Sequence, residues 1–175
     1  MSAERAGKTL RGLRPVELVD VERRRMAVDL LADVRRVDNQ LEELTKRIDV
    51  AVAASGTTVT DVCGIGSIGG ALIVGHTGDI TRFPSAGHYA RYNATAPIEA
   101  SSGPRVRHRL NPRGNRHLNH ALQVAAITQI AHETPGRVYF ERKIAEGKTR
   151  KEALRALKRR ISDAVYRQLV ADTQT

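Results

Sequence analysis

The sequence predicts a mainly α protein, in which a long N-terminal coiled-coil helix precedes a compact helical domain with a helix-hairpin-helix-like motif. Two observations predict this fold. An apolar heptad pattern runs through residues 21–55 with no Gly or Pro. Helix caps and apolar helical stripes recur from residue 111 to residue 172. We find no convincing pair of strands and no internal repeat, and 175 residues suit one compact domain plus an extended element.

The chain divides into three segments. We expect residues 1–20 to be unstructured or the remnant of a linker, residues 21–55 to form the coiled coil, and residues 56–172 to form a helical domain, for which DNA binding is argued below. The expected dimerisation seam has apolar residues at alternating steps of four and three, namely Leu30, Val34, Val37, Leu41, Leu44 and Ile48. A homodimer or higher oligomer is favoured, because a helix of about 30 residues is roughly 45 Å long and exceeds so small a domain. The alternative is an antiparallel helical hairpin within one chain.

Breaks and short helices are predicted in the middle of the chain. Gly56-Thr57-Thr58 ends the long helix, and residues 75–79 read as a turn. A short helix is expected to start at Phe83-Pro84-Ser85 and to reach Tyr92, and an irregular loop follows over residues 97–104.

The C-terminal part carries clearer helix signals. Asn111-Pro112 is expected to begin a helix that ends before Pro135-Gly136, and a short helix is expected over 138–146. Thr149 and Glu152 match a capping box. The following helix has an apolar stripe at Leu154, Leu157, Ile161, Val165 and Leu169. We expect its basic residues to face largely the other way, namely Arg150, Lys151, Arg155, Lys158 and Arg159.

The charge of the chain indicates a polyanion partner. The formal net charge is +10, and residues 105–175 hold 16 Lys and Arg against 6 Asp and Glu, so this segment accounts for the whole excess. DNA is the first expected partner and an anionic membrane surface the second. No apolar stretch is long enough to span a membrane. A single cysteine, Cys63, excludes a disulfide framework and a Cys-rich zinc site, so we expect a reducing, cytoplasmic setting. The resemblance described below narrows this expectation to the bacterial nucleoid.

A glycine-rich turn is the first candidate site. Gly64, Gly66, Ser67 and Gly69 could present backbone N–H groups to a DNA phosphate at the start of a helix. The same spacing, G-x-G-x-x-G, occurs in dinucleotide-binding domains, but the polar segment before it is not the buried strand that such domains need. An ordinary inter-helix turn stays open as the plain alternative.

A serine and arginine run is the second candidate site. Ser101 and Ser102 precede five arginines, and a hydroxyl near guanidinium groups suits attack on a phosphate. The expected DNA contacts are Arg105, Arg107, His108, Arg109, Arg113, Asn115 and Arg116. A loop that contacts the DNA backbone without chemistry is the alternative. His117 and His120 lack a third ligand at a recognisable spacing, so we expect no metal site in this chain.

Several ordered motifs resemble a known family. They are Gly64-Ile65-Gly66, Gly78-Asp79-Ile80, Arg82-Phe83-Pro84-Ser85, Ala96-Pro97, Ser102-Gly103, Arg113-Gly114-Asn115-Arg116, Leu118-Asn119, Ala121-Leu122, Tyr139 with Lys143, Glu146-Gly147-Lys148, Glu152-Ala153-Leu154 and Leu157-Lys158-Arg159-Arg160. From Val59 to Val170 the chain is similar to the C-terminal domain of the bridge-RNA-guided insertion-sequence transposases, a family that includes the Piv-type DNA invertases.

The resemblance implies DNA recombination with Ser102 as the nucleophile on a DNA phosphate. In that family an N-terminal RuvC-like nuclease domain holds Mg²⁺ through acidic residues, and a structured guide RNA selects the target. We expect that domain to be missing here, so no cofactor is expected in this chain and Mg²⁺ only with the missing domain. The triplet Asn93-Ala94-Thr95 also departs from the family pattern. The expected function is therefore the DNA-binding part of a transposase that is truncated and not self-sufficient, and the alternative is a non-catalytic DNA-binding module or vestigial fragment.

Overall fold

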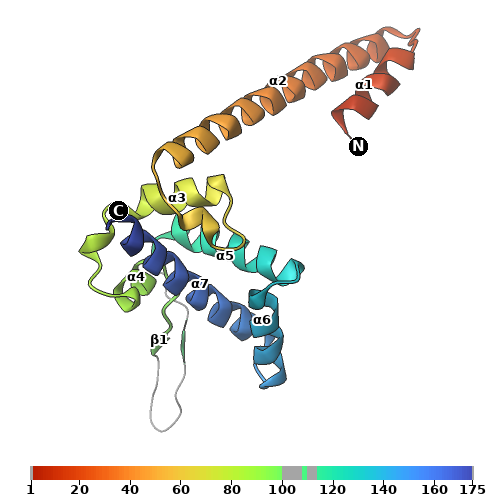
Figure 1. The fold of residues 1–175 in the computed structure, drawn as a ribbon. Helices are drawn as coiled ribbons and strands as arrows, with labels where there is room; N and C mark the ends of the chain where they lie inside the picture. Colours follow the sequence, from red (N-terminus) through yellow and green to blue (C-terminus); the bar gives the residue numbers. More distant parts are fainter. Residues whose placement is uncertain (1, 100–107, 110–113, 175) are drawn as a thin grey trace. The chain divides into compact units, whose positions relative to one another are not determined.

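The computed structural model describes residues 2–99, 108–109 and 114–174, and it confirms a mainly α fold (Figure 1). The chain separates into two compact units, Met1–Arg47 and Ile48–Thr175. The helices are α1 (Ala3–Gly12), α2 (Leu18–Ala54), α3 (Ser67–Thr77), α4 (Ala86–Tyr92), α5 (Arg116–Ala131), α6 (Pro135–Ala145) and α7 (Arg150–Asp172), with short 3-10 helices η1 (Val59–Asp61) and η2 (Ile80–Arg82).

The N-terminal segment is helical over Ala3–Gly12. Of the two expectations for residues 1–20, an unstructured segment is therefore wrong for these residues, and the remnant of a linker stays a prediction. The Ser2 hydroxyl caps α1 by accepting a bond from the N–H of Arg5. Arg24 of α2 donates a 3.0 Å bond to the carbonyl of Leu10, while Gly7 faces Leu31. The earlier residue of α1, Gly7, thus meets the later part of α2, and Leu10 meets an earlier part, so the two helices are antiparallel.

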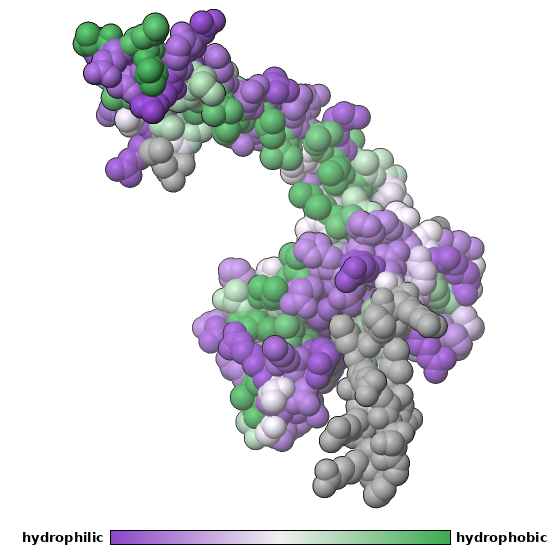
Figure 2. All heavy atoms as spheres, turned by 180° about the vertical axis from the view of Figure 1, so that it is seen from behind, coloured by the Kyte–Doolittle hydropathy of each residue, from purple (hydrophilic) through white to green (hydrophobic). Residues whose placement is uncertain are grey.

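The long helix is confirmed, and in the described part of the chain the predicted seam residues are exposed except Ile48, which is half-buried. Leu30 is 64% exposed and Leu41 is 57% exposed, and Val34, Val37 and Leu44 are exposed as well. Leu31, which faces α1, lies one residue beyond Leu30 and therefore about 100° around the helix. The intrachain hairpin thus uses a different face from the seam. Apolar side chains are visible along α2 in Figure 2.

The last part of α2 belongs to the second unit, which begins at Ile48 instead of the expected residue 56. Val52 is buried, and its side chain lies near Gly70 of α3. Burial of this residue against α3 explains the earlier boundary. The helix ends where predicted, because Gly56 adopts a φ of 66° that glycine tolerates.

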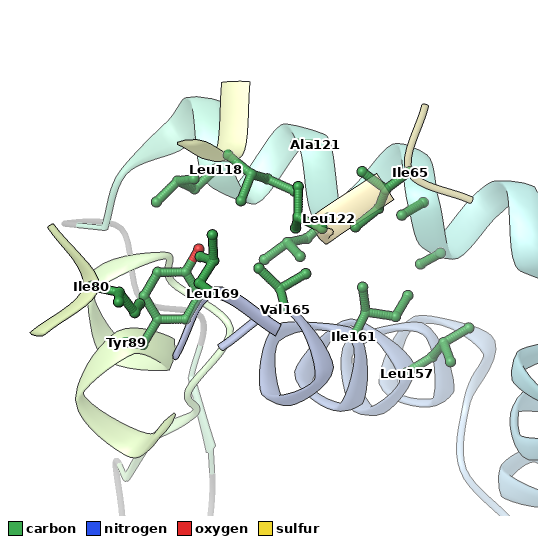
Figure 3. Packing of buried hydrophobic residues seen from close by; sticks show 14 of the residues in the cluster. Ile65, Ile80, Tyr89, Leu118, Ala121, Leu122, Leu157, Ile161, Val165 and Leu169 are labelled. Atoms are coloured by element: carbon green, nitrogen blue, oxygen red, sulfur yellow. The ribbon is translucent and has the colours of Figure 1, made fainter. Parts of the chain in front are cut away.

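The core of the second unit is aliphatic and lies between α5 and α7 (Figure 3). Ile161 and Val165 point from α7 toward α5, where Leu122 lies, and these three residues and Leu157 of α7 are all buried. This confirms most of the predicted α7 stripe. Side chains of this size each contribute about 1.5–3 kcal/mol when fully buried. Helix α3 packs on α5, and α4 and α6 pack on α7.

Aromatic residues close one end of this core. Tyr89 of α4 is completely buried beside Phe83, with the two rings edge to face and their centroids 5.3 Å apart. Its hydroxyl lies 3.0 Å from the hydroxyl of Thr77, and burial raises the pKa of Tyr89 to about 12. Thr77 is the last residue of α3, so the turn expected over 75–79 is confined to the residues after it.

Several predicted helix starts are confirmed, and others lie at different residues from those predicted. Ser85 caps α4, and Thr149 with Glu152 forms the complete capping box of α7. Helix α6 begins at Pro135, which was expected to end the preceding helix, because Thr134 supplies the cap and Pro suits the first turn. Helix α5 begins at Arg116 after an Asn115 cap, whereas the expected start at Asn111-Pro112 falls outside the described residues.

A short strand pair was not predicted. Strand β1 (Ile98–Glu99) pairs antiparallel with β2 (His108–Arg109). The pairing satisfies backbone N–H and C=O groups on the two arms of the segment between α4 and α5. Two residues per strand carry too little periodicity for a sequence pattern to reveal them.

Candidate nucleic-acid interface

The segment that carries the predicted serine is anchored where it leaves α4 and where it enters α5. The N–H of Asn115 donates a 2.7 Å bond to the carbonyl of Tyr92, which joins the two arms. The backbone pairing of β1 with β2 also joins the two arms. The predicted residues Ser102, Arg105, Arg107 and Arg113 lie outside the described residues, and His108 and Arg109 are described only in their backbone pairing.

A buried polar network lies under this junction. The side chain of Asn93 is fully buried, and its Nδ2 donates a 2.8 Å bond to Oγ of Ser162 on α7. Its Oδ1 accepts bonds from the backbone N–H and the hydroxyl of Thr95. Asn119 of α5 donates from Nδ2 to the Asn93 carbonyl at 2.9 Å. Because each buried polar group has a partner, the network fixes α4, α5 and α7 together.

Lys158 completes the network from α7. Only 7% of this residue is exposed, and its Nζ donates a 2.7 Å bond to Oδ1 of Asn119. Burial lowers the pKa of Lys158. The expectation that Lys158 faces away from the apolar stripe is therefore wrong. The sequence spacing could have predicted this burial, because Lys158 stands four residues after Leu154 and three before Ile161 and so lies on the apolar stripe.

The triplet Asn93-Ala94-Thr95, which differs from the family pattern, has an unusual backbone conformation. Ala94 adopts a φ of 61°, in the left-handed region that L-residues other than glycine rarely enter. Gly114 packs directly on Ala94, and a Cβ at Gly114 would collide with the Ala94 backbone. The close approach explains the need for glycine at position 114, and the two bonds to Thr95 hold the strained turn in place.

Asn115, which we predicted to contact DNA, has a structural role at the start of α5. Its Oδ1 accepts the N–H groups of His117 and Leu118, both at 3.0 Å. Its Nδ2 donates to the hydroxyl of Tyr92, and this bond, followed by one from Arg82, lowers the pKa of Tyr92. The neighbouring predicted contact, Arg116, is exposed at the first position of α5.

The glycine turn is fastened to α5 on one side and open on the other. Gly64 has a φ of 85°, and a Cβ there would lie 2.7 Å from the carbonyl oxygen of Ala125. The carbonyl of Cys63 accepts a 2.6 Å bond from Nε2 of Gln129. A Cβ added at Gly66 would meet no atom within 4 Å. Gly66 is the N-cap residue of α3, and no side chain caps the helix there. The N–H groups that begin α3 can therefore meet an anion.

The element before the turn is the 3-10 helix η1, which a short connection over residues 55–58 joins to α2. A strand does not precede the turn in the described segment 48–66, and this contradicts the dinucleotide-binding alternative. Helix α3 follows the turn, but η1 before it is only three residues long, so the helix-hairpin-helix stays a prediction. Of the other predicted members, Ser67 and Gly69 are half-buried in the first turn of α3.

His117, one of the two histidines considered as metal ligands, packs instead against His76 at the end of α3. The rings of His76 on α3 and His117 on α5 stack with centroids 4.4 Å apart and planes within 2°. Within the described residues no group of three or more His, Cys, Asp or Glu side chains could hold a metal ion. In the same residues no helix has the length and apolar character that a membrane span requires.

Part of this chain matches a family of transposases. Residues 56–141 match the family described as "Transposase IS116/IS110/IS902 family". That segment includes the glycine turn, the segment around Ser102 and the first turns of α6. The resemblance seen in the sequence is thus supported at the level of this transposase family.

Three relatives from insertion elements are similar to the chain. An uncharacterized 43.6 kDa protein of insertion element IS110 from Streptomyces coelicolor is 33% identical over 137 residues, covering 76% of this chain and 34% of the relative. An uncharacterized 44.8 kDa protein of IS116 from Streptomyces clavuligerus is 28% identical, covering 83% and 37%. An uncharacterized 42 kDa protein of IS900 from Mycobacterium paratuberculosis is 29% identical, covering 83% and 36%. The chain spans about a third of the length of these curated relatives.

Proposed function

We propose that residues 56–172 form the DNA-binding portion of a transposase and that Ser102 is its nucleophile. The family match over residues 56–141 carries this proposal, because it includes both candidate sites in one segment. The insertion-element relatives support a role in DNA transposition. The charge supports DNA as the partner, since all ten excess positive charges fall within residues 105–175.

Two features favour contact with the DNA backbone. At the start of α3, Gly66 leaves the first N–H groups without a side-chain acceptor, so they and the helix dipole suit a phosphate. At the start of α5, Arg116 is exposed and can donate to a second phosphate. Contacts of these kinds position a protein on DNA without reading the base sequence.

The proposed chemical step is a transesterification at phosphorus. The Ser102 oxygen forms a bond to the phosphorus of a DNA phosphodiester, the bond from that phosphorus to a deoxyribose oxygen breaks, and the proton lost by serine is balanced, through water, by the proton that the leaving oxygen gains. The product is a phosphoserine link that conserves the phosphoester bond for rejoining. Nearby arginines would stabilise the charge on the phosphate oxygens during the attack.

Mg²⁺ does not fit the part of the chain that the structure describes, because no cluster of three acidic or other metal-binding side chains is present there. We therefore assign no step of this chain to the metal. We propose instead that a nuclease domain and a structured guide RNA, both implied by the family resemblance, act together with these residues. We also propose that the exposed seam of α2 joins two or more copies as a coiled coil.

Complementation in trans tests the serine. The full chain would be mixed with a full-length family member whose corresponding serine is replaced by alanine, and strand transfer on a DNA substrate would be measured. We expect this chain to restore strand transfer, Ser102→Ala to abolish it, and the matched control Ser101→Ala to retain it. Strand transfer that is never restored, or that survives Ser102→Ala, would favour the alternative of a non-catalytic DNA-binding module.

A further inference from the structure

We propose that Tyr139, Arg142, Lys143 and Arg160 form a second phosphate-binding site, through which α6 and α7 grip the backbone of duplex DNA. These four residues are called the Tyr139 cluster below. The inference rests on the proposed function, because it takes DNA as the ligand. It adds a contact surface that is formed by elements other than the glycine turn and the start of α5.

Three cations surround one aromatic ring in this cluster. The guanidinium carbon of Arg160 lies 4.6 Å from the centre of the Tyr139 ring, and that of Arg142 lies 5.2 Å from it. The Nζ of Lys143 lies 5.5 Å from the same centre. Each distance is within the range of a cation–π interaction. Arg160 comes from α7 and the others from α6, so the fold gathers the three charges across two helices.

The cluster keeps an uncompensated positive charge. Glu146 is the carboxylate that pairs with it, and it is shared by Lys143 at 2.5 Å and Arg142 at 3.7 Å. The hydrogen bond from Lys143 lowers the pKa of Glu146, so this carboxylate is ionised at neutral pH. Among the described residues no carboxylate lies within 4.0 Å of Arg160. Three cations and one anion leave a net charge of +2.

In contrast to the cluster, two neighbouring arginines on the same helices each have their charge neutralised by a carboxylate of their own. Arg137 pairs with Glu141 at 2.8 Å, and Arg159 pairs with Asp163 at 3.1 Å. Residues 135–163 nevertheless hold ten Lys and Arg against four Asp and Glu. The one-to-one pairs are ordinary solvated ion pairs along a helix. The Tyr139 cluster is therefore the place on α6 where positive charge is concentrated across two helices.

The chemistry of the cluster suits a phosphodiester. An arginine stacked over a ring keeps its N–H edge free for two bonds to phosphate oxygens, and the Arg142 side chain is 59% exposed. Tyr139 packs partly against the core. Its ring orients the cations and is not free to insert among lipids, so duplex DNA is favoured over an anionic membrane.

The salt dependence of DNA binding tests the cluster in the full chain. A fluorescent duplex would be titrated at several salt concentrations, and thermal unfolding would confirm that each variant is folded. Arg160→Gln should weaken binding by about 3–10-fold and reduce the slope of log K against log salt by about 0.9, as expected for one lost phosphate contact. The control Arg137→Gln removes the same charge two residues from Tyr139, about 200° around α6, and should leave the slope unchanged.

A second variant should act in the opposite direction. Glu146→Gln releases Arg142 and Lys143 from their shared carboxylate, so we expect binding to tighten by about 2–5-fold, the change that corresponds to one exposed ion pair. Equal effects of Arg160→Gln and Arg137→Gln, or no tightening in Glu146→Gln, would overturn the proposal while leaving DNA binding intact. Absence of DNA binding in the unaltered chain, with or without binding to vesicles of anionic lipid, would instead overturn the proposed function and this site with it.

Discussion

Lys158 of α7 donates a 2.7 Å hydrogen bond to Asn119 of α5, and this pair supports the segment that leads to the candidate serine. Asn119 in turn donates a 2.9 Å hydrogen bond from its Nδ2 to the backbone carbonyl of Asn93. A buried cation is thereby connected to the last turn of α4. The arrangement couples the helical core to the beginning of the serine segment.

Asn119→Ala should lower the free energy of unfolding by about 2–3 kcal/mol, because it leaves the Lys158 ammonium and the Asn93 carbonyl without this partner. Chemical denaturation would measure the change. The control His120→Ala alters an exposed residue of the same helix and should cost less than about 0.5 kcal/mol. Similar stability of the two variants would show that the network does not support the fold.

The two glycines of the turn should respond differently to alanine. Gly64→Ala places a Cβ against Ala125 at a φ of 85°, so we expect a loss of about 2 kcal/mol or more in stability. Gly66→Ala meets no atom within 4 Å and should unfold like the unaltered chain. Its DNA affinity should fall, because the methyl group stands at the start of α3. Unchanged DNA affinity in folded Gly66→Ala would contradict the phosphate contact at this turn.

Asp172 should make stability depend on acid pH. Burial acts to raise the pKa of Asp172, but hydrogen bonds from Thr58 and Thr57 outweigh it and hold the pKa below its ordinary value. The stabilisation is thus complete above the unfolded pKa of about 4 and is lost as the pH falls through the folded pKa. Asp172→Ala should cost about 1–2 kcal/mol at neutral pH, and the difference should shrink in acid. Denaturation at several pH values would check this against exposed Asp61→Ala, and a difference that stays constant in acid would contradict it.

Leu41→Asp should separate the copies of a coiled coil. The side chain is 57% exposed in the single chain, so a charge there should not unfold the protein but should disrupt a seam between helices. Light scattering should give a dimer or higher oligomer for the unaltered chain and a monomer for the variant. The control Glu42→Gln, next to the seam, should keep the mass of the oligomer. An unaltered chain that is already monomeric would refute the coiled coil.

Local sequence signals predicted most of the helices. The capping box of Thr149 and Glu152, the Ser85 cap and the end of α2 at Gly56 each depend on residues close together in the chain. The position of Pro135 was ambiguous, since the same residue can follow one helix or begin the next. The helix over Ala3–Gly12 was missed although Ser2 caps it locally, and its further contacts come from α2.

The environment of the candidate site depends on contacts between distant residues. Asn93 meets Ser162 across 69 positions, and Gln129 meets Cys63 across 66. Neither pair has a spacing that a sequence pattern could reveal. The burial of Lys158 could have been inferred from its place in the apolar stripe, but its partner could not. Asn115 also caps α5, and its bond to Tyr92, 23 positions away, could not be read from the sequence.

The most direct test of the central claim is the affinity of the full chain for duplex DNA as a function of salt. Because the proposed contacts are to phosphates, log K should fall linearly with log salt, with a slope of about −3 or steeper between about 50 and 200 mM. Such a slope corresponds to at least about three phosphate contacts at roughly 0.9 each. No binding, or an affinity that does not change with salt, would contradict the proposal that this chain is the DNA-binding portion of a transposase.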